Sequence, residues 1–223
     1  MTSRSILTTL IILIALTTAL ETHAIILIDD FNGTFGPVTS IAFDDVTTLE
    51  GETDYIGISG TGGNNPTLTE GSGVGIIAAT ASSGSGGRAI LTYDGNDDDP
   101  GGVSLFVGPV DLTEAGANDR FRLDINALTG PTVLDLSVFP QSGSGQNGIV
   151  NLNISGGAQI LDIPFSSFSS PTAHLSNAGR ISIALDFDPG ESITINSISI
   201  IPEPSSVLFL TFAGTPLLFR RRR

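Results

Sequence analysis

The sequence predicts an all-β protein, an antiparallel β-sandwich of the jelly-roll type, and three observations lead there. Apolar and polar residues alternate through much of the chain, the pattern of strands with one buried and one solvated face. Turns rich in glycine, often with proline, asparagine or aspartate, separate nearly every pair of alternating segments. Between the two ends of the chain there is no convincing amphipathic helix of about ten residues or more.

The clearest alternation occurs where an apolar side chain recurs at every second position. In 121–126, Phe121, Leu123 and Ile125 share one face, so this segment is predicted to be a strand. The same pattern predicts strands at 134–138, 150–154, 181–187 and 193–200. Further strands are predicted at 25–28, 74–79, 89–93, 103–107 and 159–165. Many short strands with glycine-rich turns are typical of a sandwich or jelly roll.

The last of these strands breaks its own alternation. Its apolar positions at 193 and 195 are in phase, whereas Ile198 and Ile200 are one step out of phase. A single extra residue in a strand shifts the phase in this way. A β-bulge is therefore predicted at Asn196 and Ser197.

Two stretches are predicted to connect strands. The stretch 50–72 is low in apolar residues and is interpreted as a long loop. Gly143, Gly145 and Gly148 match the spacing of the dinucleotide-binding fingerprint, which requires a strand before it and a helix after it. Because an alternating strand follows these glycines, a hairpin connection is predicted there instead.

Residues 1–24 have the organisation of a secretory signal peptide with a helical apolar segment. Arg4 supplies a short positive region, and 6–20 is almost wholly apolar or threonine. Cleavage is expected after Ala24, with Ala19 as the alternative. The other interpretation, a retained membrane helix, is disfavoured because the run is only about 15 residues long and no basic residue stops it.

Residues 202–223 form a tail in three parts. Pro202, Glu203 and Pro204 come first, and an apolar run follows over 207–219. The tail ends in a basic cluster of Arg220, Arg221, Arg222 and Arg223. As a short helix the apolar run would measure about 20 Å, against about 30 Å for a hydrocarbon core. Arginines resist translocation, so the C-terminus is expected to stay cytoplasmic.

A buried core helix with a solvated basic end is the alternative interpretation of this tail. The prolines at 202 and 204 disfavour it, because they separate the apolar run from the strand before it. The Pro-Glu-Pro motif, the following Ser205, the short apolar run and the arginines together resemble the PEP-CTERM sorting signal of Gram-negative bacteria. Pro216, late in the apolar run, departs from the usual pattern.

This resemblance covers residues 202–223, and it implies a partner and a destination. The partner is an exosortase, a membrane-embedded cysteine protease that cuts near the Pro-Glu-Pro motif. The chain would reside briefly in the inner membrane and then reach the cell envelope, the cell surface or an extracellular polysaccharide matrix. The resemblance says almost nothing about the domain that the tail carries.

One domain is predicted between these ends, at 25–201. It contains four arginines, no lysine and 21 acidic residues, because Glu21 and Glu203 of the 23 lie outside it, so its balance is 4 − 21 = −17. Such a field repels phosphate backbones, which excludes nucleic acid as an expected partner. The chain has no cysteine, which excludes disulfides, thiolate metal sites and cysteine nucleophiles.

Four segments of this domain, 27–31, 87–93, 163–168 and 193–200, resemble in their order the galactose-binding-like jelly rolls of several carbohydrate-binding modules. In those folds the first and last strands often lie together and can share a structural calcium ion. The resemblance therefore places Asp30 near Asn196, as candidate ligands of a shared calcium ion. Asn196 departs from the aspartate often found there.

A second calcium candidate is the acidic segment 94–99. Asp94, Asn96 and Asp98 match the first half of an EF-hand loop, but Asp99 and Leu105 stand where the loop needs glycine and glutamate. A solvated acidic turn is the favoured interpretation, and a bound calcium ion is the alternative. No other cofactor is expected.

The composition narrows the chemistry further. With His23 removed in the signal peptide, His174 is the one remaining histidine, and it is predicted to be a loop residue. The chain has no tryptophan, and its tyrosines are Tyr55 and Tyr93, which disfavours strong stacking on sugars.

Two functions remain open. The favoured one is a non-enzymatic surface or matrix protein, displayed through the sorting tail, that is either structural or a weak carbohydrate-binding module for an extracellular polysaccharide. The alternative is an exported polysaccharide-active hydrolase that uses a carboxylate pair, as glycosidases do. Adjacent acids such as Asp29 and Asp30 can be explained equally well as solvated residues at strand edges or as catalytic groups.

Overall fold

The structure is a computed structural model that describes residues 25–32, 41–46, 51–58, 66–71, 73–79, 87–95, 109–130, 132–141, 148–169 and 174–202. The predicted signal helix, the strand at 103–107 and the apolar helix of the C-terminal tail lie outside these residues. None of the helices within the described ranges is long and apolar enough to cross a bilayer.

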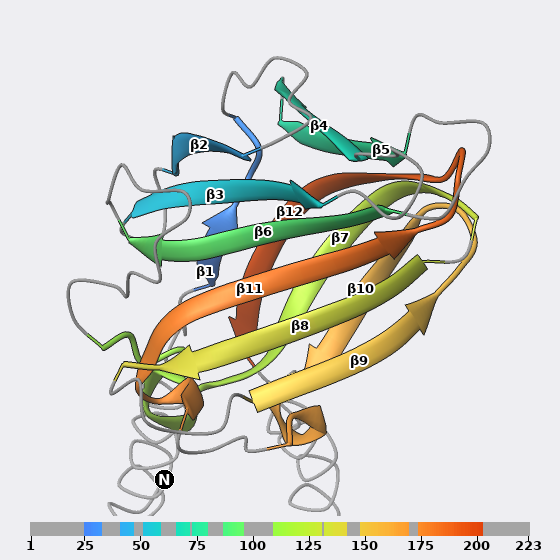
Figure 1. Cartoon of the computed structure of the whole chain (residues 1–223). Coiled ribbons are helices and arrows are strands. Elements are labelled where there is room, and N and C mark those ends of the chain that lie inside the picture. The colour runs from blue at the N-terminus through green and yellow to red at the C-terminus, as the bar shows by residue number, and fades with distance from the viewer. Residues whose placement is uncertain are drawn as a thin grey trace, which may run out of the picture.

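Two antiparallel sheets make up the fold, as the sequence predicts (Figure 1). We call the first the β7 sheet; its order is β10 (Gln159–Pro164), β7 (Asn118–Thr129), β12 (Ser192–Pro202), β5 (Val74–Ala79) and β4 (Pro66–Gly71), and β1 (Ile26–Asp29) also pairs with β12. The second, the β8 sheet, has the order β2 (Ile41–Val46), β3 (Gly51–Ile58), β6 (Gly87–Gly95), β11 (Ala178–Phe187), β8 (Thr132–Pro140) and β9 (Gly148–Ile154).

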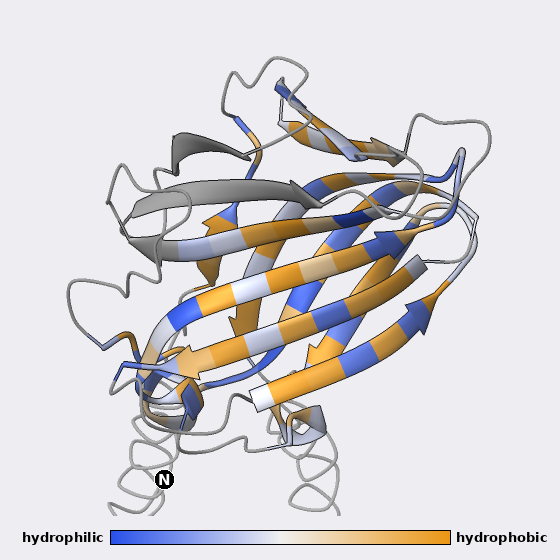
Figure 2. Cartoon of the chain, viewed as in Figure 1, coloured by the Kyte–Doolittle hydropathy of each residue, from blue (hydrophilic) through white to orange (hydrophobic). Residues whose placement is uncertain are grey.

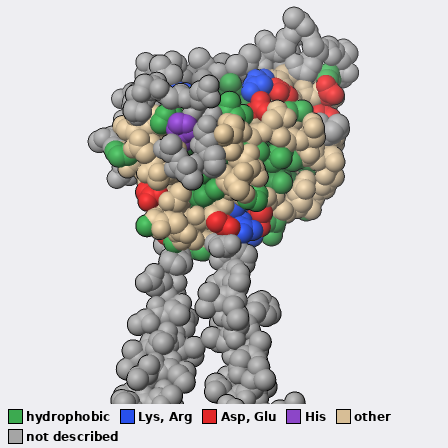
Figure 3. All heavy atoms as spheres, turned by 90° about the horizontal axis from the view of Figure 1, so that it is seen from below, with side chains coloured by type: hydrophobic (Ala, Val, Ile, Leu, Met, Phe, Trp, Pro, Cys, Tyr) green, Lys and Arg blue, Asp and Glu red, His purple; other side chains and the backbone are tan. Residues whose placement is uncertain are grey.

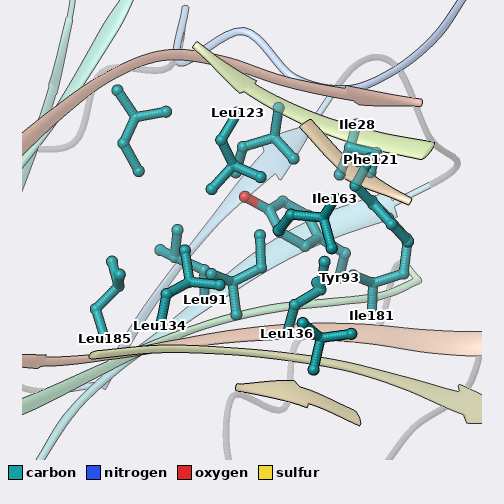
Figure 4. Packing of buried hydrophobic residues seen from close by; sticks show 14 of the residues in the cluster. Ile28, Leu91, Tyr93, Phe121, Leu123, Leu134, Leu136, Ile163, Ile181 and Leu185 are labelled. Carbon is teal, nitrogen blue, oxygen red and sulfur yellow. The ribbon is translucent and has the colours of Figure 1, made fainter. Parts of the chain in front are cut away.

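The core lies between the two sheets. Along β11, Ile181, Ile183 and Leu185 are fully buried, and along β7 so are Phe121 and Leu123. Figure 2 shows the resulting alternation of apolar and polar residues along the strands, and Figure 4 shows side chains from both sheets meeting in one cluster. Burying each such side chain stabilises the fold by about 1.5–3 kcal/mol, which makes this alternation the main determinant of the sandwich.

One end of the core is closed by aromatic side chains. The short 3-10 helix η2 (Phe165–Ser167) follows β10 and brings Phe165 against the ring of Phe121, with 5.5 Å between ring centroids in an edge-to-face arrangement. Phe168 lies on the same ring with a centroid separation of 5.6 Å. Such pairs contribute about 0.5–1.5 kcal/mol beyond area burial. A second 3-10 helix, η1 (Glu114–Gly116), precedes β7.

Several predicted local features are confirmed. The glycine-rich segment at 143–148 lies between β8 and β9, which pair antiparallel as a hairpin. The ladder between β12 and β7 skips Asn196, so the predicted bulge is present. It is matched by a second irregularity at Asn126 on β7, which the sequence analysis did not detect. The first and last strands of the domain, β1 and β12, lie side by side.

The interpretation of 50–72 as one long loop is wrong. This stretch contains β3, which pairs with both β2 and β6, and β4, which pairs with β5. In β4 the buried positions are Pro66, Leu68 and Glu70, so an alternation exists, but only one of its three inner residues is aliphatic. A hydrophobicity pattern misses such a strand because backbone pairing with its neighbours, rather than its apolar content, stabilises it. The strand β2 was likewise not predicted.

Candidate functional site

A row of polar residues crosses the outer face of the β8 sheet. Asp135 of β8 lies directly opposite Asn151 of β9, and Asp186 of β11 lies opposite Arg88 of β6. Paired residues in an antiparallel ladder project to the same face, and the neighbours of these four along their strands point into the core. We call Arg88, Asp135, Asn151 and Asp186 the polar row.

Direct contacts join the four side chains. The Arg88 guanidinium donates from Nη1 to both carboxylate oxygens of Asp186, at 3.2 and 3.1 Å, and from Nη2 to Asp135 Oδ2, at 2.9 Å. The Asn151 side-chain amide donates to Asp135 Oδ1. One arginine therefore spans three strands, and Asn151 extends the contact to a fourth.

The polar row is accessible to solvent. The side chains of Arg88 and Asp186 are 39% and 43% exposed, and that of Asp135 is 22% exposed. Ion pairs at such exposure contribute about 0–1 kcal/mol to stability, so the row contributes little to the stability of the fold. Its fixed donors and acceptors on an open face are better suited to hydrogen bonding with a polar partner.

Apolar and hydroxyl side chains both lie next to the row. The next outward pair after Arg88 and Asp186 is Ile90 and Ala184. One pair further along, Ser182 of β11 lies between Ser137 of β8 and Thr92 of β6, which is 8% exposed. Beyond them Arg180 covers the ring of Phe139, with 3.9 Å from its guanidinium carbon to the ring centroid. The described part of this face therefore combines hydroxyls, an amide, carboxylates and guanidinium groups, which can hydrogen-bond to sugar hydroxyls, with apolar residues such as Ile90, Val133 and Ile149.

The two carboxylates of the row are not arranged as a glycosidase pair. Both accept from the same guanidinium, and both are partly solvated. A general acid in such an enzyme instead needs apolar or like-charged surroundings that keep it protonated. Nothing in the polar row favours the hydrolase alternative.

A second polar cluster lies inside the sandwich. Asp29, at the end of β1, is 4% exposed and accepts from the Tyr93 hydroxyl and from the backbone N–H of Phe31, both at 2.8 Å. Burial raises the pKa of the Tyr93 phenol well above its usual range, and the charges of Asp29 and Glu70 raise it further. The cluster fixes the turn after β1, where Phe31 adopts a φ of 51° and buries its ring.

The structure locates only some of the predicted metal candidates. Asp30 accepts from the backbone N–H of Asn32 at 3.2 Å and from its side-chain amide at 2.5 Å. Because Asp29 pairs with Ile198, Asp30 and Asn196 lie toward the same end of the β1–β12 ladder. Asp94 is a residue of β6, whereas Asn96 and Asp98 lie outside the described residues.

Within the described ranges no three histidine or acidic side chains gather as a metal site. The calcium hypothesis stays a prediction, which calorimetric titration with calcium would test. Pro202 is the last residue of β12, and the rest of the predicted sorting motif and the arginine cluster lie beyond the described residues.

His174 was predicted to be a loop residue. In the structure residues 174 and 175 are helical, in the connection before β11, and His174 is buried, with 8% of its surface exposed. Its backbone oxygen accepts from Asn177 N at 3.3 Å. The face of the molecule that is seen from below carries side chains of mixed character (Figure 3). Figure 3 shows basic side chains lying against acidic ones, with apolar side chains scattered between them.

The sequence analysis did not single out the polar row. Each member stands at an outward position of an alternating strand, which is a signal that the pattern contains. The strand order that brings residues 88, 135, 151 and 186 together is not a local property, so the alternation alone could not assemble them.

The solved structures to which the chain is similar include two carbohydrate-binding modules. The chain is similar to CtCBM11, with 16% identity, 82% of this chain and 98% of that chain covered, and a TM-score of 0.44. It is similar to the family 30 carbohydrate-binding module of a cellulosomal cellulase of Clostridium thermocellum, with 11% identity, coverage of 82% and 100%, and a TM-score of 0.42.

A third similar structure is the agarase AgWH50C, with 12% identity, a TM-score of 0.48 and 82% of this chain covered. The chain spans about a quarter of that enzyme's length, 25%. No protein-family model matches the chain. No curated protein sequence matches it either.

Proposed function

We propose that this chain is an exported, non-enzymatic protein of the cell surface or extracellular matrix, whose jelly-roll domain binds a neutral polysaccharide weakly. The polar row on the β8 sheet carries the binding part of this proposal. The signal-like N-terminus and the three-part tail carry the export part, with an exosortase-type protease as the processing partner.

The chemistry of the row favours a neutral polyol. Arg88 already pairs with two carboxylates, so its positive charge is neutralised and does not attract an anionic ligand. The domain as a whole has a charge of 4 − 21 = −17 over 25–201, which repels anionic polysaccharides. Sugar hydroxyls both donate and accept, and amide, carboxylate and hydroxyl groups on a fixed sheet satisfy both needs.

Weak binding follows from what this face offers. Sugar-binding sites gain much of their affinity from aromatic rings that stack on pyranose faces. Tyr93 is buried among core residues, and Phe139 has one ring face covered by Arg180. Affinity would therefore come mostly from hydrogen bonds that compete with water, each contributing about 0.5–1.5 kcal/mol.

A matched pair of arginine variants tests the binding proposal. Arg88→Gln removes the guanidinium that organises the polar row. Arg122→Gln removes an equivalent arginine from the outer face of the β7 sheet, where it donates to Asp162 at 2.7 and 2.8 Å. Affinity electrophoresis on gels containing a neutral β-glucan, a galactan or alginate is expected to show retardation by a neutral polymer only.

The retardation should be reduced at least about threefold by Arg88→Gln, which corresponds to about 0.7 kcal/mol, and unchanged by Arg122→Gln. Equal loss in both variants, or retardation by alginate alone, would contradict a site on the β8 sheet. The export part is tested separately, by mass spectrometry of protein from a native host. Mature chains should begin near residue 25 and end near the Pro-Glu-Pro motif.

A further inference from the structure

Among the residues that the structure describes, five strands border the two sheets, and four of these contain a charged residue or a proline. β10 contains Asp162 and Pro164, β4 contains Pro66 and Glu70, β1 contains Asp29, and β2 contains Asp44 and Asp45. Charged residues and prolines at sheet edges prevent further strands from adding. β9, with the sequence Gly-Ile-Val-Asn-Leu-Asn-Ile, is the one border strand of the described sheets that has neither.

The backbone of β9 also shows which groups face outward. The N–H of Ile149 donates to the Ser169 hydroxyl at 3.2 Å, and its carbonyl accepts from Ser169 N at 3.4 Å. Both groups of Ile149 thus point away from β8. Orientation alternates in an antiparallel ladder, so the N–H and C=O of Asn151 and Asn153 point the same way. No described residue bonds to these outward groups.

Ser169 therefore closes the β9 edge at one end, and no other described residue covers it over Asn151 and Asn153, which are both exposed. An open antiparallel edge is self-complementary, because rotation by 180° brings the same donors and acceptors face to face. The distribution of charge also favours β9 as the place where two copies make contact. The domain's excess of acids repels another copy over most of its surface, whereas β9 has no charged residue.

We propose that β9 pairs antiparallel with β9 of a second copy of this chain, through the backbone of Asn151 and Asn153. The contact joins two β8 sheets into one continuous sheet of 6 + 6 strands. Since Asn151 is the outermost member of the polar row, the rows of the two copies then meet across the junction. Such a short pairing forms a weak, transient association.

The absence of cysteine from the chain allows a direct test. Full-length chains with Asn151→Cys or Asn153→Cys, alone and mixed, cover the three pairings of these positions that a two-fold axis permits. Under mild oxidation, at least one of these samples is expected to form a disulfide-linked dimer on a non-reducing gel. Ile160→Cys, on the border strand β10 and 61% exposed, is the control and should stay monomeric.

A second pair of variants tests the same contact without oxidation. Ile149→Lys adds a charge to β9, where Ile149 is 46% exposed, and Ile160→Lys adds the same charge to β10. In a cysteine background that dimerises, Ile149→Lys should lower the dimer yield at least about fivefold, and Ile160→Lys should not. Added salt should raise the yield, because it screens the repulsion between acidic copies.

Failure of all three cysteine samples to dimerise would overturn the proposal. So would equal crosslinking through Ile160→Cys, or equal loss in the two lysine variants. Because none of these readouts involves a polysaccharide, they stand or fall independently of the proposed function. Circular dichroism of each variant confirms that its sheets have formed.

Discussion

At the scale of single residues, the turn after β1 shows how a local constraint is held by distant groups. Phe31 has a φ of 51°, a conformation that costs a residue with a side chain roughly 1 kcal/mol or more. Asp29 accepts from its backbone N–H, and Tyr93 donates to the other oxygen of the same carboxylate. The buried ring of Phe31 then lies directly against Gly75 of β5.

Gly75→Ala should destabilise the protein, because a Cβ at this position would lie 2.5 Å from Cδ1 of the Phe31 ring. Overpacking of this kind costs about 1–3 kcal/mol. Gly71→Ala is the matched control in the same β4–β5 hairpin, since a Cβ there meets nothing within 4 Å. Urea unfolding should show a lower midpoint for Gly75→Ala alone. Equal midpoints would mean that Phe31 moves aside at no cost.

Tyr93→Phe should lower the free energy of unfolding by about 1–3 kcal/mol near neutral pH, because buried Asp29 loses a donor. The variant should also change the alkaline limb of the stability curve. Burial raises the folded-state pKa of Tyr93, so the unfolded chain releases this proton first. The associated stability is present below about pH 10, the usual tyrosine pKa, and declines as pH rises above it.

Unfolding by urea at several alkaline pH values measures this effect. The wild-type chain should lose stability more steeply above about pH 10 than Tyr93→Phe does. Parallel curves would show that the Tyr93 phenol ionises as readily in the folded chain as in the unfolded one.

At the scale of elements, the β7–β12 ladder depends on two compensating irregularities. β12 bulges at Asn196 and β7 skips Asn126, so Ile195 and Ile198 of β12 both reach the core. A shift of one residue turns every following side chain to the opposite face of a sheet. The bulge therefore keeps both halves of β12 facing inward.

Deletion of Asn196 should be severely destabilising. The two halves of β12 would no longer present apolar residues to one face, so either the 193–195 half or the 198–200 half would leave the core. Loss of two buried isoleucines corresponds to several kcal/mol, on the order of 4–6. Asn196→Ser keeps the extra residue and should unfold cooperatively near the wild-type midpoint. A deletion variant with a wild-type midpoint would contradict this account of the bulge.

The same elements show what the sequence could and could not predict. Strands whose inner positions are aliphatic, such as β7 and β11, were predicted because the polarity of each residue indicates which face of the sheet it occupies. β4 was missed because Glu70 and Pro66 occupy inner positions, which polarity alone assigns to a loop. The polar row was missed because strand order, which sets its neighbours, depends on pairing between segments far apart in the chain.

At the scale of the whole molecule, a large acidic excess acts against compactness. The domain carries 4 − 21 = −17 charges over 25–201, and all four of its arginines lie on strands. Arg88, Arg120 and Arg122 each contact at least one neighbouring carboxylate, which offsets part of the repulsion locally. The remaining acids repel one another through the solvent, over a range that salt controls.

Thermal unfolding should therefore depend on ionic strength and be indifferent to reductant. Raising sodium chloride from about 10 to 150 mM shortens the screening length from about 30 to 8 Å and should raise the unfolding midpoint by a few degrees. A reducing agent should change nothing, because there is no disulfide to break. Differential scanning calorimetry measures both responses. A midpoint that falls with salt would show that favourable ion pairs outweigh the acidic repulsion.

The adjacency of β1 and β12 has a consequence for how the domain is held. Ile26 pairs with Ile200, so the chain enters and leaves the sandwich at one pole, on neighbouring strands. Tethering through either end would hold the domain at the same point and in the same orientation. If both ends are processed as proposed, trimming one end and keeping the other would leave the same surface turned outward, whichever end is cut first.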